Sequence, residues 1–140
     1  MNALIHEIGE FHPALVHFPV ALTLTAAVAE ALYMGRKSGR FGDAARFVLA
    51  AAVWLSVPAA VAGLMAGESE AIPDALAGTF AVHRIAGLVA PVLIILAYAL
   101  GEGARRSGQV WEQGLYRLVL LLAAVCVLIA GFYGGPDLAF

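Results

Sequence analysis

Four long apolar stretches alternate with short polar segments along the chain. They run from Phe11 to Ala29, Phe47 to Gly67, Ile85 to Gly101 and Leu118 to Pro136, and none contains an acidic residue, a lysine or an arginine. Each is close to the ~20 residues that an α-helix needs to cross a bilayer. A lone segment in lipid satisfies its backbone hydrogen bonds only as a helix. The pattern therefore predicts an all-α fold, an integral membrane four-helix bundle in one domain (1–140), with spans at about 12–34, 45–67, 80–101 and 115–135.

The composition excludes an ordinary soluble domain. The chain is 62% hydrophobic and 13% charged, whereas soluble domains are roughly 45–50% apolar and 25% charged. No phosphate-binding glycine loop, H-E-x-x-H pair or nucleophile beside a base is present, so no enzymatic reaction is identified. No basic face indicates nucleic-acid binding, and the expected surroundings are the lipid bilayer.

The charges predict how the spans are oriented. Basic residues cluster between the first and second spans and again between the third and fourth, whereas the middle connection is acidic. The basic clusters are Arg36, Lys37, Arg40 and Arg46, and then Arg105, Arg106 and Arg117. Basic loops stay in the cytoplasm, so both termini should be periplasmic, in a bacterial inner membrane. Glu30, at the cytoplasmic end of its span, should extend to the headgroups, and Tyr116 should be an interfacial anchor.

All four histidines fall on the outer side in this topology. Two belong to the segment His12-Pro13-Ala14-Leu15-Val16-His17-Phe18-Pro19, a third is His83 at the start of the third span, and the fourth is His6. Ionisable side chains in or beside lipid are costly and mark functional sites, and neutral imidazole is the commonest metal ligand. The sequence thus indicates a histidine site near one membrane surface.

The two halves of the chain resemble each other weakly, which predicts two helical hairpins in the same orientation. Placing His17 over His83 brings the basic loops and the glycines that end each half close to alignment. Parallel repeats are related by an axis along the membrane normal. Such an axis puts the first and third spans on a diagonal, so that His17 and His83 face each other at similar depth.

Facing histidines suit a b-type haem, whose iron takes axial ligands on opposite sides of the macrocycle. Ala21 and Gly87, one turn from His17 and His83, leave room for a flat ring, and Arg84 is placed to pair with a propionate. His12 is five residues from His17, roughly 140° around a helix. It is therefore interpreted as an outer-shell residue or as the ligand of a different ion. The function predicted is electron transfer, with a quinol and a periplasmic cytochrome or iron–sulfur protein as partners.

Two alternatives remain open. His12, His17 and His83 could hold a bare copper, zinc or iron ion. Alternatively, the chain is a cofactor-free subunit of a larger membrane complex or a homo-oligomer, in which glycines and alanines serve helix packing.

The His12-to-Pro19 segment, the pair His83-Arg84 and the closing Gly131-Phe132-Tyr133-Gly134-Gly135 together resemble a family of small bacterial four-helix membrane proteins, labelled a domain of unknown function. Members occur fused to Rieske iron–sulfur or c-type cytochrome domains, so the resemblance implies a redox setting and a b-type haem. The family pattern continues after Gly-Gly with an aliphatic residue, a tyrosine and often His-Gly, but this chain reads Pro136 to Phe140 instead. The missing histidine argues against a second cofactor.

Overall fold

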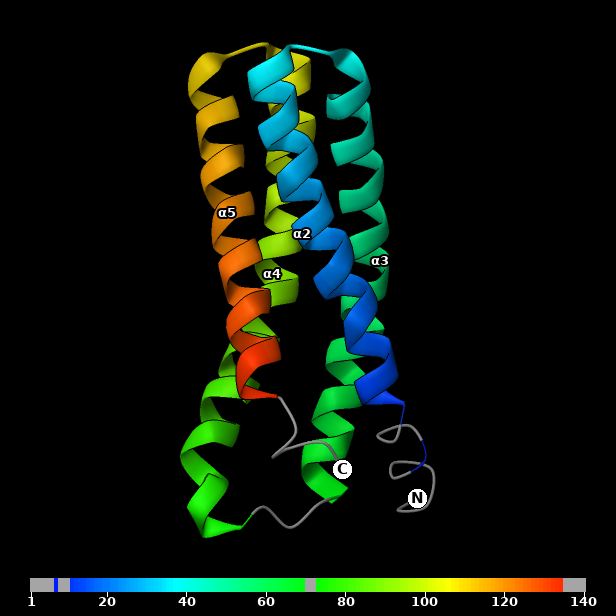
Figure 1. Cartoon of the computed structure of the whole chain (residues 1–140), viewed down its shortest axis with the longest axis vertical. Helices are drawn as coiled ribbons and strands as arrows, with labels where there is room; N and C mark the ends of the chain where they lie inside the picture. The colour runs from blue at the N-terminus through cyan, green and yellow to red at the C-terminus, as the bar shows by residue number, and fades with distance from the viewer. Residues whose placement is uncertain (1–6, 8–10, 70–72, 135–140) are drawn as a thin grey trace.

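The computed structural model describes residues 7, 11–69 and 73–134. The chain forms helices α2 (His12–Arg36), α3 (Gly39–Ser69), α4 (Ala77–Ser107) and α5 (Val110–Tyr133), with a short 3-10 helix, η1 (Asp74–Leu76), before α4 (Figure 1). Within the described ranges there is no strand. In the described part of the chain, four helices are long and apolar enough to cross a membrane. The prediction of an all-α fold with four spans is therefore confirmed. His6, which the sequence places on the outer side, lies outside the described residues.

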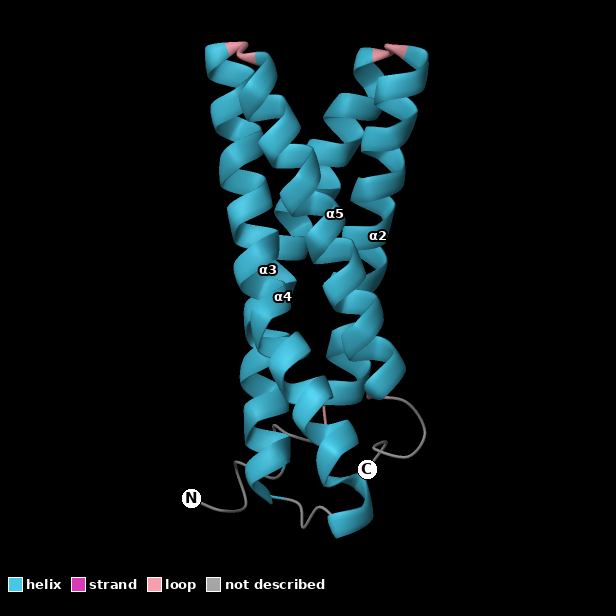
Figure 2. Cartoon of the chain, turned by 90° about the vertical axis from the view of Figure 1, so that its left-hand side faces the viewer, coloured by secondary structure: helices cyan, strands magenta, loops and turns pink. Residues whose placement is uncertain are grey.

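The helices form two hairpins that pack side by side. α2 packs mainly on α3, and α4 mainly on α5, while α3 also contacts α4 and α2 contacts α5. The expectation that the first and third spans occupy a diagonal is met, because α2 and α4 are not among the closely packed pairs. The hairpins lie together through the middle of the bundle and separate toward the end that carries the α2–α3 and α4–α5 turns (Figure 2).

Both tight turns are built in the same way. Lys37 ends α2 with a left-handed backbone (φ 53°), and Gly108 ends α4 with φ 68°. The N–H of each residue donates to a carbonyl four residues earlier, that of Tyr33 or of Ala104. This arrangement satisfies a helix-end carbonyl and reverses the chain, and glycine adopts it without steric cost.

The bundle core is made largely of small side chains, which let the helix backbones approach closely. Larger aliphatic side chains fill the spaces between these small residues. The fully or almost fully buried core residues include Ala26, Leu49, Ala52, Ile94, Ala97, Leu120 and Ala123.

Large apolar side chains cover the outside of the bundle, as expected of a surface in contact with lipid. Trp54 and Phe132 are each 81% exposed, and Phe47 is 75% exposed. Water would disfavour so continuous an apolar surface. The helices therefore present a lipid-facing surface around the whole bundle.

The hairpins are equivalent, but in a different register from the one predicted. The turn residues Lys37 and Gly108 correspond, as do the core residues Ala26 and Ala97 (108 − 37 and 97 − 26 both equal 71). At this shift His83 corresponds to His12. The alignment of His17 with His83 was wrong, because core positions filled by alanine and leucine recur too often for the sequence alone to fix the register.

Candidate functional site

A pair of histidines, one from each of the diagonal helices α2 and α4, lies at the end of the bundle where α2 begins. His12 is the first residue of α2, and His83 lies near the start of α4. Their ring centroids are 6.1 Å apart, and the ring planes are inclined by 74°. Both side chains are partly buried. The structure thus brings together two imidazoles that are distant in sequence and come from different hairpins.

Each ring is held by a backbone carbonyl of the neighbouring helix. The Nδ1 atom of His12 lies 3.0 Å from the oxygen of Ala59 in α3, and that of His83 lies 2.8 Å from the oxygen of Ala130 in α5. A carbonyl only accepts, so Nδ1–H donates in both cases. The proton is thereby fixed on Nδ1, which leaves the Nε2 lone pair available to a metal. Ligating histidines are commonly oriented in this way.

Glycines make the space that the two rings occupy. A Cβ atom on Gly63 would lie 2.6 Å from Cε1 of His12, and a Cβ atom on Gly134 would collide with the same atom of His83. Each glycine follows the carbonyl residue by one helical turn, as Ala59-x-x-x-Gly63 and Ala130-x-x-x-Gly134. Each half of the site is therefore a histidine, a carbonyl and a glycine in the same relation.

The other histidine of the opening motif lies apart from this pair. His17 is exposed, and its Nδ1 atom is 2.5 Å from the carbonyl oxygen of Pro13 in its own helix. The structure places His12 beside His83, so the facing pair predicted from sequence is corrected from His17 and His83 to His12 and His83. The reason is the 71-residue register of the hairpins, which puts His17 on the outside of α2.

Three residues were predicted to flank a haem, and the structure places two of them near the histidine pair. Ala21 is exposed on the outer surface of α2, whereas both histidines of the pair are partly buried. Gly87 is partly buried, and a Cβ atom there would meet nothing within 4 Å, so open space lies one turn from His83. Arg84 is exposed beside His83. Gly87 and Arg84 therefore keep positions near the pair, whereas Ala21 does not.

The donor set at the histidine site is small. No group of three or more histidine, cysteine or acidic side chains comes together among the described residues. Cys126, in the middle of α5, donates its S–H to the carbonyl of Ala86 and is no part of the pair. Protein side chains in this part of the chain thus supply two nitrogen ligands.

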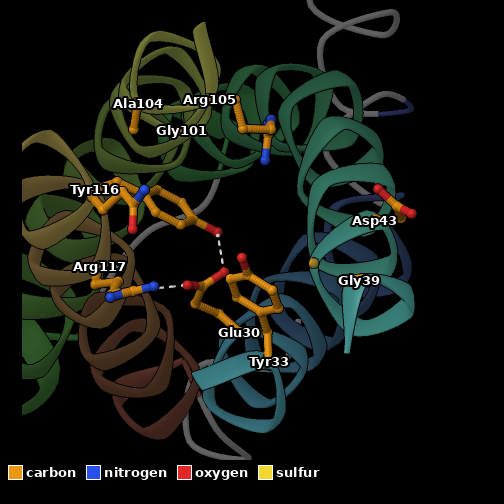
Figure 3. A pocket seen from close by; sticks show the side chains of 11 residues that line it. Glu30, Tyr33, Gly39, Asp43, Gly101, Ala104, Arg105, Tyr116 and Arg117 are labelled. Carbon is orange, nitrogen blue, oxygen red and sulfur yellow. Dashed lines mark hydrogen bonds and ion pairs between the residues drawn. The ribbon is translucent and has the colours of Figure 1, made fainter. Parts of the chain in front are cut away.

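The opposite end of the bundle holds a second polar cluster, which the sequence did not predict. Glu30 is 6% exposed, so it does not extend to the surface as expected. Its Oε1 atom accepts from Nε of Arg117 at 2.8 Å, and its Oε2 atom accepts from the hydroxyl of Tyr116 at 3.3 Å (Figure 3). Tyr116 is also 6% exposed, which corrects its assignment as an interfacial anchor.

A related ion pair joins the hairpins on the other side of this end. Arg46 of α3 donates to both carboxylate oxygens of Glu102 in α4, at 2.7 and 3.0 Å, and Arg105 also binds Glu102. Arg46 and Arg117 correspond in the 71-residue register (117 − 46). In each case an arginine from the second helix of one hairpin pairs with a glutamate from the first helix of the other. The signal in the sequence was a glutamate near the end of the first helix of each hairpin and an arginine near the start of the second helix of the other hairpin.

The sequence profile of a family described as predicted membrane protein (DUF2231) matches residues 10–139. The chain belongs to this family. No curated protein and no solved structure matches the chain. The family match covers nearly all of the sequence, including both histidines, both glycines and the two polar clusters, and it agrees with the resemblance seen in the His12-to-Pro19 segment. The family description gives a membrane protein and states no chemistry for it.

Proposed function

We propose that this DUF2231 protein binds one b-type haem between His12 and His83 and carries electrons at one membrane surface. The observation that carries the proposal is the pair itself: two imidazoles with centroids 6.1 Å apart, each with Nδ1 bound to a carbonyl. Two imidazole nitrogens that each bound one metal at about 2 Å would need a ring separation of about this size.

The number of protein ligands favours haem over a bare ion. Haem iron already has four nitrogens from the porphyrin and needs at most two more from the protein. The described residues supply two, and no larger donor cluster. Zinc sites in proteins are usually four-coordinate, with three or four protein ligands. A two-histidine site therefore suits haem better than zinc.

The residues around the pair fit a haem. Gly63 and Gly134 leave room for the two imidazole rings. The carbonyls of Ala59 and Ala130 fix the orientation of these rings and raise the basicity of the rings as ligands. A Cβ atom on Gly87, one turn from His83, would meet nothing within 4 Å, so there is open space beside this glycine. Arg84, exposed at the helix start, is suited to a propionate at the membrane boundary. A bound haem would supply one-electron redox chemistry at this position.

The location of the pair indicates which partners it would serve. The His12 end of the bundle lies opposite the turns that carry the basic residues. By the distribution of basic residues, this end faces the periplasm of a bacterial inner membrane, with both termini on that side. A quinol in the membrane and a periplasmic cytochrome or iron–sulfur protein are the proposed donor and acceptor.

A two-histidine site for copper is the second candidate. The donor set is two imidazole nitrogens, and among the described residues no carboxylate joins them to make a group of three. Imidazole suits copper as well as iron. An ion held by two protein ligands would exchange readily, whereas haem is also retained by the burial of its apolar ring.

The visible absorption spectrum of the protein, purified from membranes of a haem-producing bacterium, tests the proposal. A Soret band that shifts on reduction, with about one haem per chain by the pyridine haemochrome assay, is the expected result. Copper by elemental analysis without a Soret band would replace haem with the second candidate. If the purified protein contains neither haem nor metal, the cofactor-free subunit is the remaining alternative.

A further inference from the structure

A cavity of about 170 Å³ lies at the end of the bundle opposite the histidine pair. All four long helices line it, and they do so where the two hairpins separate (Figures 2 and 3). Its walls include Gly39 and Gly42 of α3 and Gly101 of α4. The volume far exceeds that of one water and is below that of a typical drug-sized pocket. The cavity therefore suits a small polar group.

The two carboxylates at the cavity are either engaged or turned outward. Both carboxylate oxygens of Glu30 accept bonds, one from Arg117 and one from Tyr116. Asp43, the other acidic residue of the wall, is exposed and points away from the centre of the cavity (Figure 3). A cationic ligand would find no uncommitted carboxylate here.

Hydrogen-bond donors, by contrast, remain in excess. A guanidinium carries five N–H donors, and among the described contacts Arg105 bonds only Glu102, while Arg117 uses only Nε on Glu30. The hydroxyl of Tyr33 is directed into the same space and has no partner within the described residues (Figure 3). The cavity therefore offers donors to a ligand rich in acceptors.

Helix termini of both kinds meet at this end of the bundle. α3 begins at Gly39 and α5 at Val110, so both helices start at this end of the bundle, and Gly39 and Gly42 of the first turn of α3 lie in the cavity wall. The N-terminus of a helix carries a partial positive charge and N–H groups without intrahelical partners. α2 and α4 end at this same end of the bundle, so their partial negative charges offset those of the two N-termini. The preference for an anion therefore rests on the two arginines and the Tyr33 hydroxyl.

We propose that this cavity binds a phosphate group, held by Arg105, Arg117 and Tyr33. Phosphate has acceptor oxygens only, and arginine matches its geometry. Two sources share this chemistry: the headgroup of an anionic phospholipid in the cytoplasmic leaflet, and free phosphate from the aqueous phase. The inference is independent of haem, because Glu30 lies 18 residues from His12 along α2, about 27 Å by helical rise.

Native mass spectrometry and thermal unfolding of the detergent-solubilised, full-length protein test the site. Retention of one phosphatidylglycerol per chain, with no effect of inorganic phosphate, would identify a lipid headgroup. A rise in unfolding temperature with millimolar inorganic phosphate, and competition with the lipid, would identify the free anion. If phosphatidylglycerol is retained no better than phosphatidylcholine and phosphate has no effect, the proposal is wrong.

Three variants separate a built site from general attraction to basic loops. Arg105→Gln should weaken binding of whichever probe binds by about tenfold or more, and Tyr33→Phe by about threefold, the usual scale for charged and neutral hydrogen bonds. Arg106→Gln removes the same charge from the next residue, which is exposed and does not line the cavity. Equal losses for Arg105→Gln and Arg106→Gln, or no loss with Tyr33→Phe, would overturn the assignment. Haem content, measured on the same samples, tests the proposed haem site separately from the phosphate site.

Discussion

His12 and His83 lie opposite each other across the diagonal of the bundle, with ring centroids 6.1 Å apart and ring planes inclined by 74°. Neither ring is held by its own helix: each Nδ1–H donates to the paired helix of its hairpin, at Ala59 or Ala130. All four long helices therefore contribute to one pair of side chains. A shift of any helix by one residue would break a hydrogen bond or move one ring out of its place opposite the other.

The first prediction concerns the ligand pair. His12→Ala and His83→Ala should each lower haem content by at least about tenfold, because loss of an axial ligand exceeds the tenfold to hundredfold effect of outer-shell changes. His17→Ala should keep the Soret band, since that ring is exposed and bonded to Pro13 in its own helix. Pyridine haemochrome assays on the three purified variants provide the measurement. Loss of haem in His17→Ala alone would restore the register predicted from sequence.

The second prediction concerns the glycines under the rings. Gly63→Ala and Gly134→Ala should both displace an imidazole, because the new Cβ atom would be too close to Cε1 of His12 or of His83 for an ordinary van der Waals contact. Overpacking of this kind typically costs about 1–3 kcal/mol. Gly114→Ala is the matched control, because a Cβ there meets nothing within 4 Å in a helix. Unfolding in detergent and haem content should fall together in the first two variants. Unchanged haem in both would show that the rings are not confined.

The general architecture could be predicted from the sequence because it depends on simple quantities. Span length, hydropathy and the two basic loops fix four helices and their pairing as hairpins. The position of His83 at the start of its span followed from the same pattern. These features need no knowledge of which residues touch.

The histidine partner and the polar cluster could not be predicted in this way. The register of the hairpins depends on how alanines such as Ala26 and Ala97 pack, and nearly every alignment of an alanine-rich sequence matches some of them. Glu30 was placed at the surface because its partner Arg117 is 87 residues away in sequence. Long-range pairing of this sort is set by packing between hairpins, which leaves no local periodicity.

The third prediction concerns the α2–α3 turn. Lys37 adopts a left-handed backbone (φ 53°) where the second hairpin has Gly108. A residue with a side chain costs roughly 1 kcal/mol or more in this conformation. Lys37→Gly should therefore stabilise the protein by up to about 1 kcal/mol, reduced by the greater freedom of glycine in the unfolded chain. Gly108→Ala should destabilise it by a similar amount. Opposite signs in detergent unfolding are the expected result, and equal signs would contradict it.

The fourth prediction concerns orientation in the membrane. The basic residues lie at the end of the α2–α3 and α4–α5 turns, so this end should be cytoplasmic. A reporter that is active only in the cytoplasm should stay inactive when fused after Phe140, and should be active when inserted at the α2–α3 turn. The reverse result would move the histidine pair to the cytoplasmic side and exclude a periplasmic electron acceptor.

The last prediction concerns the two arginine–glutamate pairs between the hairpins. Removing one partner of a fully buried pair costs about 3–5 kcal/mol, because the remaining charge stays buried. Glu30 is nearly buried, with a side chain 9% exposed, but the Arg117 side chain is 31% exposed. Arg117→Gln should therefore destabilise the bundle by about 2–3 kcal/mol, somewhat less than the fully buried case.

Arg46→Gln is the matched control for this pair, because it occupies the corresponding place in the other hairpin. The Arg46 side chain is 50% exposed, and Glu102 keeps a second partner in Arg105, so the loss should be under about 1 kcal/mol. Glu30→Gln with Arg117→Gln should recover part of the stability lost in Arg117→Gln alone, since no charge is then left unpaired at this position. Equal losses for Arg117→Gln and Arg46→Gln, with no recovery in the double variant, would show that Glu30 is solvated and that the cluster does not hold the hairpins together.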